Sequence, residues 1–297
     1  MGMNNSIGYY PGCSCSKNGL AKYYGESTVK ILEHLGLKVS EIEDWNCCGS
    51  SLYRVIDEKK AYLLAGRNLV LAKKKSVEKI VVPCPACCIS LTKTLQKIRE
   101  DKELEKKFVE VYNTGKEDLS RIVVKHVVDF ILNDVGLDKI EESIKNKFED
   151  LKVGVYYGCQ ITRPYASFDD PEFPSSLERI LSTTGVATIE SAMKTKCCGG
   201  LLMLTNEEEV LKIIEKIMNS YIDRGAQCIV TACPLCHLNL ELAKNILMKK
   251  YDVRYDIPIL YFTQILGLSL GLESRDLGVS REDFEKISRK IVLTARR

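Results

Sequence analysis

The chain has 297 residues, of which 45% are hydrophobic and 28% charged, a composition typical of a soluble globular protein with room for two domains. The formal net charge of +3 gives no reason to expect nucleic acid or an anionic membrane as a partner. The amino-terminal residues form no secretory signal, and the longest apolar stretch, residues 260–272, is too short and too interrupted to span a bilayer. We therefore predict a cytoplasmic protein whose only membrane contact would be made through partners.

The first half is expected to alternate short buried strands with helices. In chain order, strands are predicted at residues 7–10 and 79–82, and helices at residues 19–35, 58–75 and 86–99. Residues 101–150 are rich in Lys and Glu and contain a helical pattern at residues 123–135. We interpret this stretch as the tail of a first domain and its connection to a second, with a boundary near Leu151.

The second half repeats the same order of elements. Strands are predicted at residues 153–157 and 227–230, and helices at residues 206–224 and 235–248. Residues 259–272 are expected to be a core element, with docking of a partner or a membrane surface as the alternative. Strands that alternate with helices favour parallel sheets with crossover connections.

The fold class that follows is α/β. We predict two homologous Rossmann-like domains with parallel sheets, residues 1–150 and residues 151–297, related by internal duplication.

Cysteine is the strongest signal in the sequence. Thirteen cysteines in a large chain without an export signal indicate metal binding or redox chemistry in a reducing compartment rather than disulfides. Five of them recur in one order, as C…CCG…CPxC, with corresponding cysteines 146 to 150 residues apart. The first set is Cys13, Cys47, Cys48, Cys84 and Cys87, and the second is Cys159, Cys197, Cys198, Cys233 and Cys236.

The local sequence explains how distant cysteines could meet. Ligands of parallel α/β sheets bind at the carboxyl ends of strands, where four of these cysteines are expected. Pro85 and Pro234 suit the first turn of a helix, whose free amides and partial positive charge favour thiolate. Gly49 and Gly199 follow the vicinal pairs and allow the turn that lets both neighbours face one centre.

The number of cysteines distinguishes between metals. A structural zinc ion or a cubane cluster takes four ligands, whereas each half offers five cysteines. The same fifth cysteine in both halves favours a larger or unusual iron–sulfur cluster, with zinc or a dithiol/disulfide pair as alternatives.

At this point the chain resembles a known family, the B-type subunits of heterodisulfide reductase. The resemblance covers nearly the whole chain and rests on the cysteine motifs and the residues around them. The segments are YYPGCS, DWNCCGSS, VVPCPAC, FDDPEFPSSLERIL, KCCGGLL, CPLCHLNL and PILYFTQILGLSLGL.

The resemblance implies two noncubane [4Fe-4S] clusters, each held by one of the two sets of five cysteines. It implies that the clusters face each other across the domain interface and reduce a disulfide, or in reverse form one. It further implies two partners, a ferredoxin-like iron–sulfur subunit of the C type and a flavin subunit of the A type, with a small thiol, disulfide or sulfur carrier as substrate. The chain has no ferredoxin-type CxxCxxCxxxCP run of its own.

The chain departs from the family pattern at three positions. Gln160 follows the second lead cysteine, where His is common, and Cys15 and Cys88 are additional cysteines beside the motifs. The substrate therefore stays open. A component of a quinone-linked succinate or fumarate enzyme, a noncatalytic electron relay and a zinc-stabilised scaffold are the other hypotheses.

Some residues outside the cysteine sets are also candidates. His237 could donate a proton to a leaving thiolate, or could simply bond to backbone at a helix start. Arg163 and Lys196 could attract an anionic group, Trp45 is expected to pack near the first vicinal pair, and Cys228 is expected to be a buried hydrophobic residue.

Overall fold

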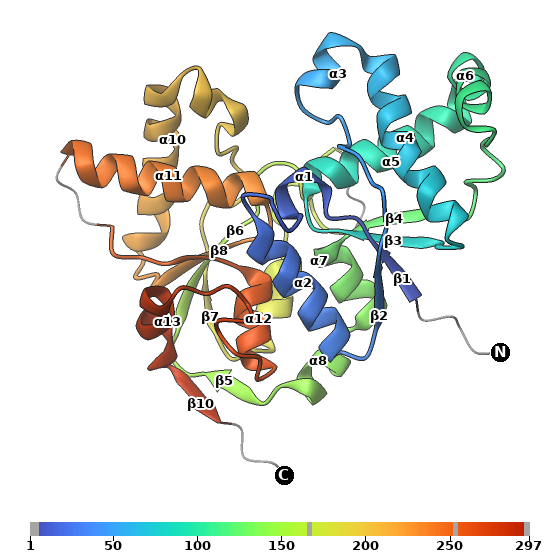
Figure 1. Cartoon of the computed structure of the whole chain (residues 1–297). Helices are drawn as coiled ribbons and strands as arrows, with labels where there is room; N and C mark the ends of the chain where they lie inside the picture. Colours follow the sequence, from blue (N-terminus) through green and yellow to red (C-terminus); the bar gives the residue numbers. More distant parts are fainter. Residues whose placement is uncertain (1–5, 165–167, 252–254, 294–297) are drawn as a thin grey trace.

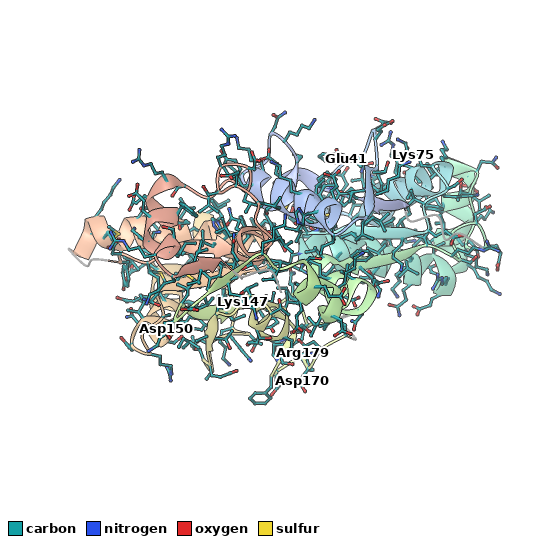
Figure 2. All side chains as sticks on the ribbon, turned by 90° about the horizontal axis from the view of Figure 1, so that it is seen from below. Glu41, Lys75, Lys147, Asp150, Asp170 and Arg179 are labelled. Carbon is teal, nitrogen blue, oxygen red and sulfur yellow. The ribbon has the colours of Figure 1, made fainter. Side chains whose placement is uncertain are left out.

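The structure is a computed structural model that describes residues 6–164, 168–251 and 255–293. It has two halves side by side, each built on its own sheet (Figure 1). Seen from below, the ribbon of the first half occupies one end of the molecule and that of the second half the other, with Lys147 near the middle (Figure 2).

The first half contains a four-stranded parallel sheet in the order β2-β1-β3-β4. Its strands are β1 (Ser6–Tyr9), β2 (Lys38–Glu41), β3 (Lys79–Val82) and β4 (Val123–His126). The helices of this half are α1 (Gly12–Cys15), α2 (Lys22–His34), α3 (Leu52–Ile56), α4 (Glu58–Lys74), α5 (Pro85–Glu100) and α6 (Lys102–Tyr112).

The second half contains a four-stranded parallel sheet in the equivalent order, β7-β6-β8-β9. Its strands are β6 (Lys152–Tyr156), β7 (Ala187–Ile189), β8 (Cys228–Thr231) and β9 (Ile259–Tyr261). The helices are α9 (Ser176–Ser182), η2 (Gly200–Leu204), α10 (Glu207–Ile222), α11 (Pro234–Tyr251), α12 (Phe262–Ser269) and α13 (Arg281–Ser288). The predicted α/β fold with two similar Rossmann-like halves is confirmed.

Between the sheets, the chain does not follow the sequence pattern. The expectation of one helical stretch over residues 123–135 is wrong for the first four residues. They form β4, which pairs with β3, and only then do α7 (Val127–Phe130) and the π-helix η1 (Ile131–Val135) follow. The run Val-Val-Lys-His-Val-Val fits either structure locally, and pairing with the sheet edge decides in favour of a strand.

The connection packs against the second half. It continues through α8 (Leu137–Ser143) to β5 (Asn146–Phe148), which pairs antiparallel with β10 (Ile291–Leu293) near the carboxyl end. The Lys145 amide donates to Ser269 O at 2.8 Å, and Asn146 Nδ2 donates to Leu268 O at 2.9 Å. The domain boundary near Leu151 stays a prediction.

One hydrophobic core extends through both halves. It contains Tyr24 and Val127 from the first half together with Val153 and Phe262 from the second, all fully buried. The Tyr24 hydroxyl donates to Ala232 O at 3.0 Å, and its ring stacks on Tyr261 with centroids 4.3 Å apart. Because burial of apolar surface contributes about 25 cal/mol per Å², a core shared in this way holds the halves together.

Helix α12 is buried on all sides. Each of its residues, Phe262 to Ser269, is buried, so the prediction that residues 259–272 include a core element is confirmed. Among the helices of the described ranges, none is long and apolar enough to cross a membrane.

Candidate metal centres

A glycine in the left-handed region precedes the lead cysteine of each set. Gly12 has φ +62° and Gly158 has φ +70°. A Cβ on Gly12 would lie 2.9 Å from Cys87 Sγ, and one on Gly158 would lie 2.6 Å from Cys236 Sγ. Only glycine fits at these two positions, because the backbone before each lead cysteine passes close to the sulfur of the last cysteine of the same set.

The two CPxC motifs begin helices, as predicted. Cys84 is the N-cap of α5, Pro85 occupies the first turn, and Pro234 begins α11. All four CPxC cysteines are buried. The two helices run outwards in opposite directions from the centre of the molecule (Figure 1).

Each vicinal pair lies on a glycine turn. Gly49 and Gly199 have φ of +67° and +85°. The Gly49 amide lies 3.4 Å from Cys47 Sγ and donates to it. The turn brings the first cysteine of each pair to the surface, Cys47 and Cys197, and buries the second.

Two side chains per half fix these turns, and the sequence patterns do not indicate them. Tyr10 and Tyr156, both fully buried, donate from their hydroxyls to the carbonyls that precede the vicinal pairs, at 2.7 and 2.8 Å. Ser90 and Asn239 donate to the carbonyls of the second cysteines, at 2.7 and 3.1 Å. Both pairs follow the internal repeat, which is the signal that could have identified them.

The thiols of each set lie close enough to shift one another's pKa values. In the first half these couplings link Cys13 with Cys47, Cys47 with Cys48, Cys48 with Cys87 and Cys87 with Cys84. The sulfurs of Cys48 and Cys87 are 3.1 Å apart. In the second half the same order recurs, Cys159–Cys197–Cys198–Cys236–Cys233.

Such crowding separates the pKa values of neighbouring thiols. The hydrogen bond from Cys159 lowers the pKa of Cys197 to about 2, and that from Cys47 lowers the pKa of Cys48 to about 4. The donor shifts in the opposite direction, since hydrogen bonding to Cys197 raises the pKa of Cys159. Each set therefore holds at least one thiolate readily, and thiolate is the form that binds metal.

The second centre opens into a cleft of about 810 Å³. Cys159 and Cys197 lie in its wall, together with basic and acidic side chains: Arg163, Lys194, Lys196, Arg224, Glu172 and Glu190. Arg163 Nη2 donates to Thr195 O at 2.7 Å. A small molecule entering this cleft would reach two of the five sulfurs directly.

The additional cysteines lie outside the two sets. Cys15 is buried, and burial raises its pKa, with smaller contributions from Cys84 of one set and Cys233 of the other. Cys88 and Gln160 line a cavity of about 230 Å³ between the halves. Cys228 is fully buried in β8, as predicted.

The two histidines near the centres bond to backbone. His237 Nε2 lies 2.9 Å from Ile259 O, and its ring stacks on Tyr261 at 4.2 Å. His126 Nε2 lies 2.9 Å from Pro83 O. Burial lowers the pKa of each to about 4, so both are neutral near pH 7. This placement favours a structural role for His237, and proton donation stays a prediction.

Trp45 lies beside the first centre but is only half-buried. Its ring meets Tyr10 edge-on at 6.0 Å, and Nε1 donates to Glu41 Oε1 at 2.9 Å. It therefore packs on the tyrosine that holds the vicinal turn.

The donor set fits a cluster better than a single ion. All thirteen cysteines are free thiols. Within the described residues, no group of three or more His, Cys, Asp or Glu side chains is placed so that it could hold a metal ion. The five cysteines of each set nevertheless exceed the four ligands of structural zinc.

A family model named CCG, the cysteine-rich domain, matches residues 7–92 and 153–241. The chain belongs to this family and carries two copies of its domain. Within the family it is similar to the B-type subunits of heterodisulfide reductases.

Curated relatives align with almost the whole chain. The B-type subunit of the ferredoxin:CoB-CoM heterodisulfide reductase of Methanosarcina mazei is 26% identical, with 95% of each chain covered. The 8-methylmenaquinol:fumarate reductase membrane anchor subunit of Wolinella succinogenes is 27% identical, covering 94% of this chain and 96% of the relative. A protein described as iron–sulfur, from Methanococcus maripaludis, is 24% identical over 82% of this chain and 42% of its own length. Family and relatives together support iron–sulfur clusters in this protein.

A solved structure confirms the fold. The crystal structure of a hypothetical protein from Helicobacter pylori superimposes with a TM-score of 0.70 at 14% identity, covering 93% of this chain and 51% of the other.

Proposed function

We propose that this chain holds two noncubane [4Fe-4S] clusters, one on each set of five cysteines, and is the catalytic subunit of a heterodisulfide reductase-like complex. The complex would reduce a thiol-derived S–S bond, or form one in reverse. The observation that carries the proposal is the recurrence of five cysteines in one order in both halves, with the second cysteine of each vicinal pair and all four CPxC cysteines buried. A spare cysteine would have no reason to recur at the same place.

The residues of the chain would have distinct parts in this reaction. The buried CPxC thiols would hold each cluster, while the exposed Cys47 and Cys197 lie where substrate can approach. When bound, the clusters would supply electrons and an iron site for a substrate sulfur. Arg163 and Lys196 in the cleft could orient an anionic substrate group.

Partner subunits are part of the proposal, because the curated relatives are subunits of larger enzymes. A ferredoxin-like iron–sulfur subunit would deliver electrons drawn from a flavin subunit. The short helix after each vicinal pair supports a docking role, since Val55 is 87% exposed in α3 and Leu204 is 83% exposed in η2. Apolar side chains exposed beside both centres are typical of an interface.

A quinone-linked function is the second candidate. It is favoured by the similarity to the 8-methylmenaquinol:fumarate reductase anchor, at 27% identity over 94% of this chain. Quinol-dependent fumarate reduction after reconstitution with a flavoprotein partner would support it over disulfide chemistry.

The test is anaerobic purification with iron, sulfide and zinc analysis, followed by EPR with and without a thiol under oxidising conditions. About eight irons per chain and a signal that changes on adding thiol are expected. Iron at this level without a thiol response would favour the quinone or relay function. Zinc with little iron would refute the proposal.

Matched cysteine variants test the ligand sets. Cys47→Ser and Cys197→Ser should each remove about half of the iron, because each set lies within one half. Cys228→Ser should keep all of it, because Cys228 is buried in β8 away from both sets.

A further inference from the structure

The second cysteine of each vicinal pair is buried, and the two halves surround it differently. Cys48 is 2% exposed and Cys198 is 4% exposed. In water-excluded surroundings a hydrogen bond to sulfur acts with little competition from solvent. The donors around these two sulfurs therefore matter for any cluster that they hold.

In the second half, a buried amide lies against the sulfur. Asn239 of α11 is 1% exposed, and its Nδ2 lies 2.9 Å from Gly200 O, 3.1 Å from Cys198 O and 3.5 Å from Cys198 Sγ. The two carbonyl acceptors determine that the NH₂ group, not the oxygen, faces the turn. One hydrogen serves Gly200 O, and the other lies between the oxygen and the sulfur of Cys198. A thiolate in a cluster carries negative charge and attracts this second hydrogen more strongly than a thiol does.

In the first half, Ser90 occupies the position of Asn239 and has no hydrogen left to donate to the cysteine sulfur. Ser90 is 1% exposed, donates its single hydroxyl hydrogen to Cys48 O at 2.7 Å, and accepts from Arg54 Nη2 at 2.9 Å. The atom that lies against Cys48 Sγ is instead Cys87 Sγ, at 3.1 Å.

We infer that Asn239 raises the reduction potential of the cluster in the second half, and that Ser90, at the equivalent position, does not do so in the first. This inference rests on the proposed iron–sulfur clusters. Reduction adds negative charge that spreads onto the ligand sulfurs, and a donor to those sulfurs stabilises the reduced form. The two duplicated centres would thus differ in potential through one position of the repeat, so the second potential can be changed without the first.

The test is a potentiometric titration of the anaerobic protein, followed by its visible absorption and EPR, beside iron and sulfide analysis. Asn239→Ser gives the second half the residue of the first and should move one reduction step to more negative potential. Ser90→Asn gives the first half the amide of the second and should move the other step to more positive potential. Asn133→Ser, the same exchange at an exposed position of η1, should move neither.

The outcomes separate this inference from the proposed function. Wild-type protein without iron and sulfide would refute the clusters themselves. Full cluster content with unmoved steps in both variants would overturn the inference alone, as would two variants that move the same step. If Asn239→Ser fails to retain iron, Ser90→Asn still decides, because it leaves the second half unchanged and adds an amide to the first.

Discussion

Gly158 offers the sharpest test of how the second centre is built. Its φ of +70° is unfavourable for any residue with a Cβ, and in Gly158→Ala that atom would lie 2.6 Å from Cys236 Sγ. The left-handed backbone alone costs roughly 1–2 kcal/mol in stability. Restoring an ordinary contact of about 3.5 Å would require the sulfur to move by roughly 1 Å. A ligand sulfur displaced that far should no longer hold the second cluster.

Gly225→Ala is the matched control. Gly225 has φ +81°, but the nearest atoms to its Cβ are in the Lys152 side chain at 4.0 Å. Both variants should therefore lose about 1–2 kcal/mol for the backbone, while only Gly158→Ala should lose about half of the iron. Iron and sulfide content and urea unfolding of both variants measure this. A Gly158→Ala protein with full iron and the same stability as Gly225→Ala would refute the reasoning.

Three further predictions follow from buried groups. Tyr156→Phe removes the 2.8 Å hydrogen bond to Lys196 O and should lower the free energy of unfolding by about 1 kcal/mol. It should also speed the release of iron to a chelator. An unchanged release rate would contradict the role of Tyr156 in the turn. Burial lowers the pKa of His126 from 6.5 to about 4, so this side chain is neutral in the folded protein near pH 7. As the pH falls from 6.5 towards 4, the unfolded chain binds a proton at this histidine before the folded protein does, and the stability of the folded protein therefore falls. His126→Asn should abolish up to about 3 kcal/mol of that pH dependence in urea unfolding, compared with wild type at each pH. Cys228→Ala should cost about 1 kcal/mol and keep all iron, and a loss of iron would show that a sixth cysteine belongs to a centre.

The elements that carry the cysteines could be predicted from the sequence. The predicted strand at residues 79–82 is β3, and the predicted helix at residues 86–99 lies within α5. A β-branched run followed by Cys-Pro gives a strong local signal for a strand that ends at a helix start. The grouping of five cysteines also follows, because parallel strands bring their carboxyl ends to one edge.

Sequence patterns do not predict the structure where contacts between residues far apart in the chain determine it. Residues 123–126 are a strand because β3 has a free edge beside them, which no local pattern reveals. Tyr10 and Asn239 support the vicinal turns through contacts with residues 36 and 41 positions away. Tyrosine and asparagine are common in cores and helices, so the internal repeat could mark these positions but only the three-dimensional surroundings show what the side chains do.

The shared core fixes how the two cysteine sets are placed relative to each other. Tyr24 of the first half is hydrogen-bonded to Ala232 and stacked on Tyr261, both beside the CPxC helix of the second half. Residues so tightly packed cannot act as a hinge, since close-packed interiors resist continuous deformation. The distance between the two cysteine sets is then fixed by the packing, and any molecule that reached both sets at once would have to match that distance in length.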